Sequence, residues 1–93
     1  MIRSFACDET ELIYDGYYSK KLPTEIQRIA RRKLIILNAA VSINDLRVPP
    51  GNRLEKLEGK REGQHSIRIN DQWRICFHWI ENDCYNVEIV DYH

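Results

Sequence analysis

The sequence QHSIRINDQWRICFHWIENDCYNVEIVDYH, residues 64–93, carries the strongest structural pattern in this chain. Apolar side chains alternate with polar ones, and β-branched and aromatic residues fill most of the apolar positions. Three segments show this alternation: residues 64–70, 73–80 and 84–92. Polar triplets separate them, and the pattern is typical of three antiparallel strands joined by two hairpins. The odd-numbered residues, which include Phe77 and Trp79, are predicted to face the core.

The register of these strands follows because an apolar face must stay on the same side of the sheet across each turn. A loop of three residues at each break, at 70–72 and at 81–83, satisfies this condition. The predicted cross-strand pairs are Ile67 with Ile75, Ile75 with Ile89, and Phe77 with Val87.

The same register places Arg68 directly opposite Arg74 on the other face, which also carries Tyr92. Like charges that face each other across a ladder destabilise the sheet, by up to about 1 kcal/mol if they mirror favourable pairs. A bound anion between the two guanidinium groups would relieve this repulsion. The pair is therefore a candidate phosphate site.

Two helices are predicted upstream of the sheet. Asp8 and Glu11 resemble a helix start, which predicts a short helix over residues 8–16. Apolar residues then recur with helical periodicity over residues 23–41, with Pro23 in the first turn. The outer face of this second helix is assigned the residues Arg28, Arg31, Arg32 and Lys33, which either contact RNA or an acidic partner or simply form a solvated surface.

The remaining segments complete the predicted order β-α-α-β-β-β-β, an α+β fold with a helical layer on an antiparallel sheet. Residues 1–5 form an extra strand that holds the N-terminus at the sheet. Residues 53–58 alternate weakly and form the strand before the three-stranded unit. The 93 residues are enough for one domain, residues 1–93, and too few for a second.

Charge is balanced overall but unevenly distributed. The chain has 14 Lys and Arg against 14 Asp and Glu, yet residues 47–74 contain seven basic and four acidic residues, and residues 75–93 contain four acidic and no basic ones. This local surplus is compatible with nucleic-acid binding and also with an ordinary solvated surface. The candidate phosphate-binding residues within it are Arg53, Lys56, Lys60, Arg61 and Arg68.

Cysteine usage and hydropathy indicate a soluble intracellular protein. The three cysteines, Cys7, Cys76 and Cys84, are odd in number and lack CxxC spacing, so neither a disulfide framework nor a zinc site is expected. We expect no leader peptide, and no apolar run of about 18 residues occurs in the sequence. We therefore expect reduced thiols, no metal, no cofactor and no membrane association.

Short motifs along the whole chain resemble the HigB-like branch of the RelE/ParE superfamily of bacterial toxins. Each motif is weak alone, but together, in this order and at these spacings, they are fairly specific. The residues that carry the resemblance are Met1–Phe5, Pro50–Leu54, Leu57–Gly59, Gln64–Asn70, Gln72–Ile75 and Asp91–His93.

The resemblance implies a RelE-like fold and a cytoplasmic toxin that cleaves mRNA on the ribosome without a metal. It also implies a HigA-like helix-turn-helix antitoxin, through which alone the toxin would reach operator DNA. Carried over to this chain, the family's active site corresponds to Arg74 and the terminal Asp91-Tyr92-His93. The family has a further histidine on the strand after the Pro-Gly turn, where this chain has Glu55.

These residues supply each group that RNA cleavage without a metal requires. Arg74, with Arg68 opposite, presents guanidinium donors to phosphate oxygens. His93 titrates near neutrality and is the candidate general acid, while Glu55 or Asp91 acts as base or orients the histidine. Tyr92 stacks on a base or donates its hydroxyl. His65 and His78 are interpreted as structural.

Two other functions stay open on the sequence alone. One is inhibition of a target such as gyrase by binding, as in ParE-like proteins, and the missing histidine favours this. Alternatively the chain is an inactive toxin retained as the partner or co-repressor of its antitoxin. A terminal histidine is also often a frayed chain end.

Overall fold

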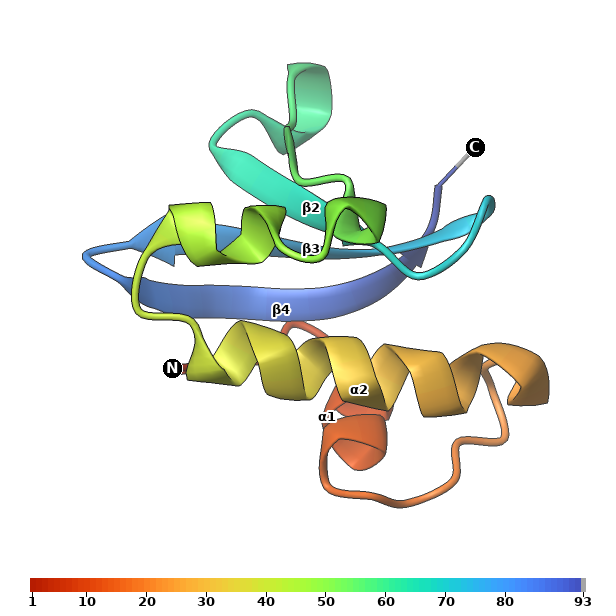
Figure 1. The fold of residues 1–93 in the computed structure, drawn as a ribbon. Coiled ribbons are helices and arrows are strands. Elements are labelled where there is room, and N and C mark those ends of the chain that lie inside the picture. Colours follow the sequence, from red (N-terminus) through yellow and green to blue (C-terminus); the bar gives the residue numbers. More distant parts are fainter. Residues whose placement is uncertain (93) are drawn as a thin grey trace.

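Two helices pack on one face of a four-stranded antiparallel sheet in the computed structural model, which describes residues 1–92 (Figure 1). The helices and strands are α1 Asp8–Tyr14, α2 Thr24–Ala39, β1 Glu55–Lys56, β2 Gln64–Arg68, β3 Trp73–Ile80 and β4 Asp83–Asp91. Three 3-10 turns connect them: η1 Ile43–Arg47, η2 Pro50–Asn52 and η3 Gly59–Arg61. The strands follow chain order across the sheet, and the predicted α+β class is confirmed.

The predicted register of the first hairpin is confirmed. Ile67 pairs with Ile75 and Arg68 pairs with Arg74, and the pairing of Ile75 with Ile89 joins β3 to β4. Because side chains alternate between the two faces of a strand, these pairs fix which residues share a face. The isoleucines lie in the core beneath the sheet, and the arginines project from the other face.

The turn of the second hairpin is shorter than predicted. Ile80 pairs with Asp83, so the turn contains two residues rather than three. Both of them, Glu81 at φ 48° and Asn82 at φ 69°, have positive φ. This combination is typical of the two-residue turn whose twist matches the flanking strands.

A bulge in β4 compensates for the short turn. The register shifts by one residue between Cys76 and His78 of β3, and Asn86 on the opposite strand adopts φ 54°. An extra residue of this kind restores the predicted register for the rest of the hairpin. Phe77 and Val87, predicted as a regular pair, fall in the irregular segment and do not form one.

The N-terminal segment lies alongside β4 without forming the predicted strand. It makes two isolated parallel bridges, Ile2 with Cys84 and Phe5 with Val87. Asn86 donates its backbone N–H to Ser4 Oγ at 2.8 Å, which ties the bulge to this segment. The N-terminus is thus held at the sheet as predicted, by bridges rather than by a continuous ladder.

The two helices begin and end close to the predicted residues. Helix α1 starts after Cys7 without a side-chain cap, so Asp8 is its first residue rather than its cap. It ends before Gly16, whose φ of 91° is available to glycine at little cost. Helix α2 follows Pro23, which fits the first turn because it has no N–H to donate. No helix in residues 1–92 is long and apolar enough to span a membrane.

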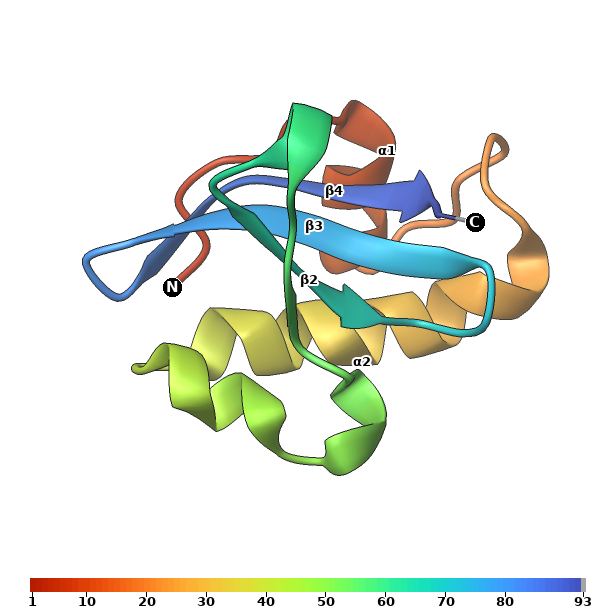
Figure 2. The same ribbon diagram turned by 90° about the horizontal axis from the view of Figure 1, so that it is seen from above.

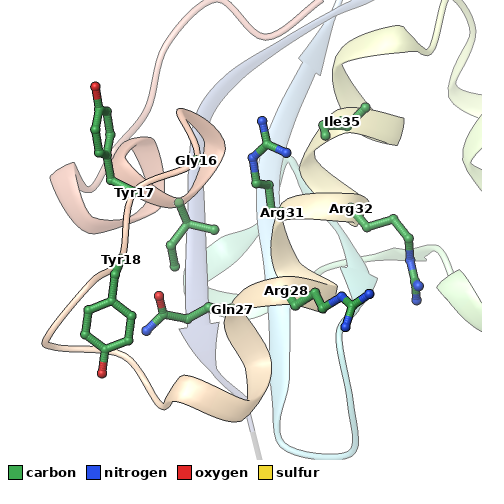
Figure 3. Close-up of a pocket in the computed structure, with 9 residues that line it drawn as sticks. Gly16, Tyr17, Tyr18, Gln27, Arg28, Arg31, Arg32 and Ile35 are labelled. Carbon is green, nitrogen blue, oxygen red and sulfur yellow. The ribbon is translucent and has the colours of Figure 1, made fainter.

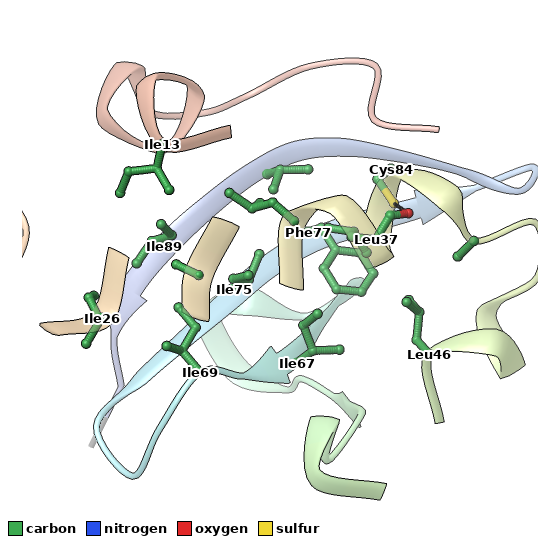
Figure 4. Close-up of a cluster of buried hydrophobic side chains, with 14 residues drawn as sticks. Ile13, Ile26, Leu37, Leu46, Ile67, Ile69, Ile75, Phe77, Cys84 and Ile89 are labelled. Atoms are coloured by element: carbon green, nitrogen blue, oxygen red, sulfur yellow. Dashed lines mark hydrogen bonds between the residues drawn. The ribbon is translucent and has the colours of Figure 1, made fainter. Parts of the chain in front are cut away.

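The core lies between the helices and the sheet, with α1 packed against β4 and α2 packed against β3 and β4 (Figures 1, 2 and 4). Phe77 is fully buried and Trp79 is partly buried against the cluster. Burying each large apolar side chain contributes about 1.5–3 kcal/mol. The buried cluster consists of Ile13, Ile26, Ala30, Leu34, Leu37, Ala40, Leu46, Ile67, Ile69, Ile75, Phe77, Cys84, Val87 and Ile89.

Residues at two places in the chain face differently from the prediction. Before the bulge the core-facing residue of β4 is Cys84, which is fully buried, whereas Tyr85 is only half-buried. The bulge exchanges the two faces along β4, which alternation alone could not reveal. On α2, Lys33 was assigned to the solvated face, but its side chain is 8% exposed and belongs to a buried contact described below.

Candidate active site

A row of polar side chains crosses the face of the sheet that points away from the helices. The register aligns Glu55 of β1, Ser66 of β2 and Cys76 of β3, and Arg74 follows on the same face of β3. Ser66 and Cys76 are fully buried and Arg74 is 7% exposed, although this face carries no helix. Leu57, in the segment between η2 and η3, is buried as well. The face therefore has its own covered interior.

Arg74 is held by hydrogen bonds on two of its three guanidinium nitrogens. Nε donates to Ser66 Oγ at 2.7 Å, and Nη2 donates to the carbonyl oxygens of Ser66, at 3.3 Å, and Arg53. The third nitrogen, Nη1, lies 3.9 Å from Glu55 Oε1. A buried arginine needs such partners because an unpaired charge is costly to desolvate. The side chain is therefore fixed, with Nη1 directed toward the open carboxylate.

The turn that supplies the Arg53 carbonyl is itself anchored to α2. Asn52 is fully buried, and its Nδ2 donates to two backbone carbonyls of the preceding segment, both at 3.2 Å. Its Oδ1 accepts a hydrogen bond from Lys33 Nζ, and burial lowers the pKa of that lysine. Arg53 follows in the left-handed region at φ 44°. A continuous set of contacts thus runs from Lys33 through Asn52 and Arg53 to Arg74.

Glu55 and Tyr92 form the open side of the site. The Glu55 side chain is 51% exposed, and Tyr92 is 40% exposed. The Cζ atom of Arg74 lies 6.0 Å from the centre of the Tyr92 ring, within the range of a cation–π contact. Tyr92 donates its backbone N–H to the Gln72 carbonyl at 2.7 Å, which positions it beside the hairpin. A fixed cation, a carboxylate and an aromatic ring therefore meet at one surface.

Arg68 has a different partner from the one predicted by the register argument. Its Nη2 forms an ion pair with Asp71 Oδ1 at 2.5 Å, and Asp71 is fully exposed. Arg74 meanwhile turns to the Ser66 and Arg53 oxygens. The repulsion between the two arginines is therefore relieved within the chain, and the register alone no longer requires an anion. Phosphate binding by Arg68 stays a prediction.

The other predicted phosphate-binding residues lie around this face. Arg61 Nη1 contacts Gln64 Oε1 at 3.1 Å and Glu88 Oε1 at 3.0 Å, and the hydrogen bond to Glu88 raises the pKa of Arg61. Lys56 lies on β1 and Lys60 on η3, both exposed. The side chain of Arg53 is also exposed, although its carbonyl is bound to Arg74.

Asp91 and His93 are the predicted proton-transfer residues at the C-terminal end. Asp91 ends β4, pairs with Trp73, and accepts a hydrogen bond from Gln72 Nε2 at 3.0 Å. Its role as a base is still a prediction. His93, predicted as the general acid, lies outside the described residues.

Burial favours the neutral form of three titratable side chains in the sheet, on one face or the other. Burial raises the pKa of the Cys76 thiol, and it raises the pKa of Cys84 to about 12. Burial also lowers the pKa of His65, which stacks on Phe77 with ring centroids 6.1 Å apart. Its Nδ1 is buried without a hydrogen-bond partner within residues 1–92. No cluster of His, Cys, Asp and Glu that could hold a metal occurs in this part of the chain.

Sequence reasoning missed three supporting residues: Ser66, Asn52 and Lys33. Ser66 was within reach, because the predicted register already places it on the face of Arg74 and diagonal to it. Asn52 and Lys33 carried no signal, because their contact joins a helix to a distant turn. Only the packed structure brings them together.

Residues 3–93 match the family described as RelE-like toxin of type II toxin-antitoxin system HigB. The chain is 48% identical over 72 residues to Toxin HigB-1 of Vibrio cholerae, covering 77% of this chain and 76% of that protein. It is 34% identical over 98 residues to Endoribonuclease HigB of Proteus vulgaris, covering all of both chains.

Solved structures agree on the fold. The toxin–antitoxin complex YoeB–YefM from Staphylococcus aureus contains a chain that matches with a TM-score of 0.61, covering 100% of this chain and 98% of that one. A second YoeB–YefM complex from the same organism matches with a TM-score of 0.57 over the same coverage. At 17% sequence identity these likenesses concern the fold alone, and they confirm the predicted RelE-like architecture.

Proposed function

The chain belongs to the HigB-like toxins of type II toxin–antitoxin systems, and from this we propose that it is an endoribonuclease that cleaves mRNA on the ribosome. The observation that carries the proposal is the open surface formed by Arg74, Glu55 and Tyr92. It combines a cationic donor for the phosphate, a carboxylate that can act as the base and a ring on which a nucleotide base can stack.

Cleavage is assigned to attack of the ribose 2′-oxygen on the adjacent phosphorus. A base removes the 2′-hydroxyl proton, a phosphorane develops negative charge, and an acid protonates the departing 5′-oxygen. The products are a 2′,3′-cyclic phosphate and a free 5′-hydroxyl. Each step needs a positioned group, and general acid or base catalysis contributes typically about 10²- to 10⁴-fold.

Arg74 stabilises the phosphorane through Nη1. Its other nitrogens are engaged by Ser66 and Arg53, so the guanidinium is already oriented when substrate arrives. A donor that needs no reorganisation stabilises developing charge more effectively than a mobile one. The single side chain thus supplies electrostatic stabilisation that is fixed by the fold.

Glu55 is the base in this scheme. Its side chain is 51% exposed, so a substrate can reach it, and its Oε1 lies 3.9 Å from Arg74 Nη1, the nitrogen assigned to the phosphate. The family has a histidine at this position, and a carboxylate can accept the same proton. His93 is the general acid, with Tyr92 stacking on the neighbouring base. Asp91 orients this C-terminal segment.

The partners follow from the same proposal. Exposed Arg53, Lys56 and Lys60, which surround the site, contact the phosphates of mRNA and ribosomal RNA. The toxin acts in the cytoplasm, where ribosomes are found. A HigA-like helix-turn-helix antitoxin neutralises it and brings it to operator DNA, which the toxin itself does not read.

The proposal is tested by mapping mRNA 5′ ends in cells shortly after the chain is induced without its antitoxin. We expect growth to slow and new 5′-hydroxyl ends to appear inside translated frames. The Glu55→Gln variant, expressed to the same level, is expected to lose most of these ends. Growth arrest without new ends would favour a target inhibited by binding, such as gyrase. Normal growth at confirmed soluble expression would point to an inactive toxin.

A further inference from the structure

A groove lies between the loop after α1 and the outer face of α2 (Figure 3). Both elements belong to the helical side of the molecule (Figure 1). It encloses about 370 Å³. Figure 3 shows Tyr17 and Tyr18 on one side and Arg28 and Arg31 on the other. The sheet separates this groove from the face that carries Arg74, so the groove is not part of the proposed active site.

Three exposed side chains with large apolar surfaces line the groove. Tyr17 is 67% exposed, Tyr18 is 60% exposed and Ile35 is 45% exposed, and all three line it. Large apolar side chains that are scattered singly over a surface need no explanation, whereas a group of them around one hollow marks an interaction site.

The charges of the groove are all of one sign. Arg28, Arg31 and Arg32 are exposed along α2, and none of them takes part in an ion pair with any of residues 1–92. Arg31 has an internal contact, because its Nε donates to the Tyr14 carbonyl at 3.3 Å at the end of α1. Arg28 and Arg32, by contrast, have neither an ion pair nor a side-chain hydrogen bond within residues 1–92.

We infer that this groove is the docking site for an acidic amphipathic segment of the antitoxin. The inference rests on the proposed function, since it takes the antitoxin as partner. Apolar side chains of the segment fill the hollow between Tyr17 and Ile35, and its carboxylates pair with Arg28 and Arg32. RNA fits less well, because a nucleic-acid surface would not gather an exposed isoleucine and two tyrosines around a cavity.

Charge complementarity and burial make separate demands on the same partner. The arginines select for acidic residues, accelerate encounter and make binding dependent on ionic strength. The apolar residues favour binding of a helical or extended segment that presents a row of apolar side chains on one side. A segment that meets only one demand would bind more weakly than one that meets both.

The test measures binding of the purified chain to its proposed HigA-like antitoxin, by isothermal titration calorimetry. The charge-reversal variant Arg28→Glu/Arg32→Glu is expected to weaken binding on the order of 30-fold or more, because like charges then face each other. Ile35→Ser is expected to weaken it about tenfold through lost burial. Arg31 stays unchanged because it also contacts the end of α1.

Two control variants keep the result interpretable. Arg47→Glu reverses an exposed arginine on η1 outside the groove and is expected to bind within about twofold of the unmodified chain. Arg28→Lys/Arg32→Lys keeps the charge and is expected to bind nearly as well. Circular dichroism melting of every variant confirms that the fold is retained.

Unchanged affinity for both groove variants would overturn the inference. Unchanged antitoxin affinity together with lost mRNA cleavage would also overturn it and assign the groove to the ribosome instead. The proposed function is judged separately, by whether the unmodified chain cleaves mRNA. The titration reports on the groove whichever way that experiment ends.

Discussion

The two faces of the sheet bury their side chains by different means. Beneath the helices, Phe77, Ile75 and Ile67 are held by apolar contact with many neighbours. On the opposite face, Ser66 and Arg74 are buried as deeply but depend on particular hydrogen bonds. Apolar burial tolerates substitution when volume and patterning are kept. A buried polar group tolerates little, because a lost partner leaves an unsatisfied donor or acceptor.

This difference separates stability from activity. The helical face should govern the free energy of unfolding, and the Arg74 face should govern catalysis with a smaller effect on stability. The comparison fails if core variants alter the chemistry of the molecules that remain folded, or if Arg74 variants act only by unfolding the protein.

The largest effect is expected for Phe77→Ala on the helical face. Phe77 is the largest fully buried side chain, and its removal leaves a cavity that costs about 3–5 kcal/mol of unfolding free energy. Urea denaturation followed by circular dichroism measures this loss. Cleavage per folded molecule should stay near that of the unmodified chain, so a specific loss of activity at full folding would break the comparison.

The next effect is expected for Arg74→Lys on the opposite face. Lysine keeps the charge but cannot donate to Ser66, Arg53 and substrate at once. We expect ribosome-dependent cleavage to fall on the order of 10²- to 10³-fold, as for removal of one fixed donor to a developing oxyanion. Single-turnover cleavage of a ribosome-bound mRNA measures it.

Arg68→Lys is the matched control for this variant. Arg68 lies opposite Arg74 in the ladder but is already paired with exposed Asp71, so its replacement should change cleavage far less. Equal losses for the two variants would show that overall charge, rather than the fixed geometry of Arg74, governs activity. Arg74→Ala is less informative, because its buried acceptors would be left unpaired and the fold itself would weaken.

A smaller effect on both properties is expected for Asn52→Ala. The variant leaves Lys33 and two carbonyls without their partner, which costs about 1–3 kcal/mol of unfolding free energy. It also frees the turn that presents the Arg53 carbonyl to Arg74, so cleavage should fall on the order of tenfold to a hundredfold. The exposed Asn44→Ala serves as control and should change neither. Lost stability with undiminished cleavage would show that the turn does not position Arg74.

Alternation predicted the sheet correctly where each strand is regular. The pairs of Ile67, Arg68 and Ile75 follow from one apolar face that must stay continuous. The two-residue turn and the Asn86 bulge escaped detection because their register changes cancel, leaving the distal pairs as predicted. Alternation does not reveal the short turn or the bulge, yet it predicts the correct register for the strand residues beyond them.

The site was predictable only in part, for a related reason. Arg74, Glu55 and Tyr92 were identified by resemblance, and the register placed Arg74 and Tyr92 on one face. Lys33 was placed on the solvated face because a long cationic side chain is seldom buried. Its contact with Asn52 depends on how a turn packs against a helix, and no local pattern encodes that distance.

The smallest effect is expected on the pH dependence of the free energy of unfolding. It tests whether one titratable residue, His65, destabilises the apolar face at low pH. His65 stacks on Phe77 with its Nδ1 buried and unpaired within residues 1–92. Its pKa is lowered by burial first, and then by the nearby charges of Lys56 and Arg47. The folded chain therefore binds the histidine proton less readily than the unfolded chain. Stability from this residue is complete above the unfolded pKa of about 6.5 and is lost as pH falls below it toward the folded pKa.

His65→Phe isolates this contribution, because phenylalanine keeps a ring against Phe77 and cannot titrate. Urea unfolding at pH 7.5 and at pH 5.5 should show the unmodified chain losing more stability on acidification than the variant. Other titrating groups are common to both proteins, so the difference between them reports on His65. Equal losses for the two proteins would mean that the His65 ring is hydrated or hydrogen-bonded in solution and that its burial does not contribute to the pH dependence of stability.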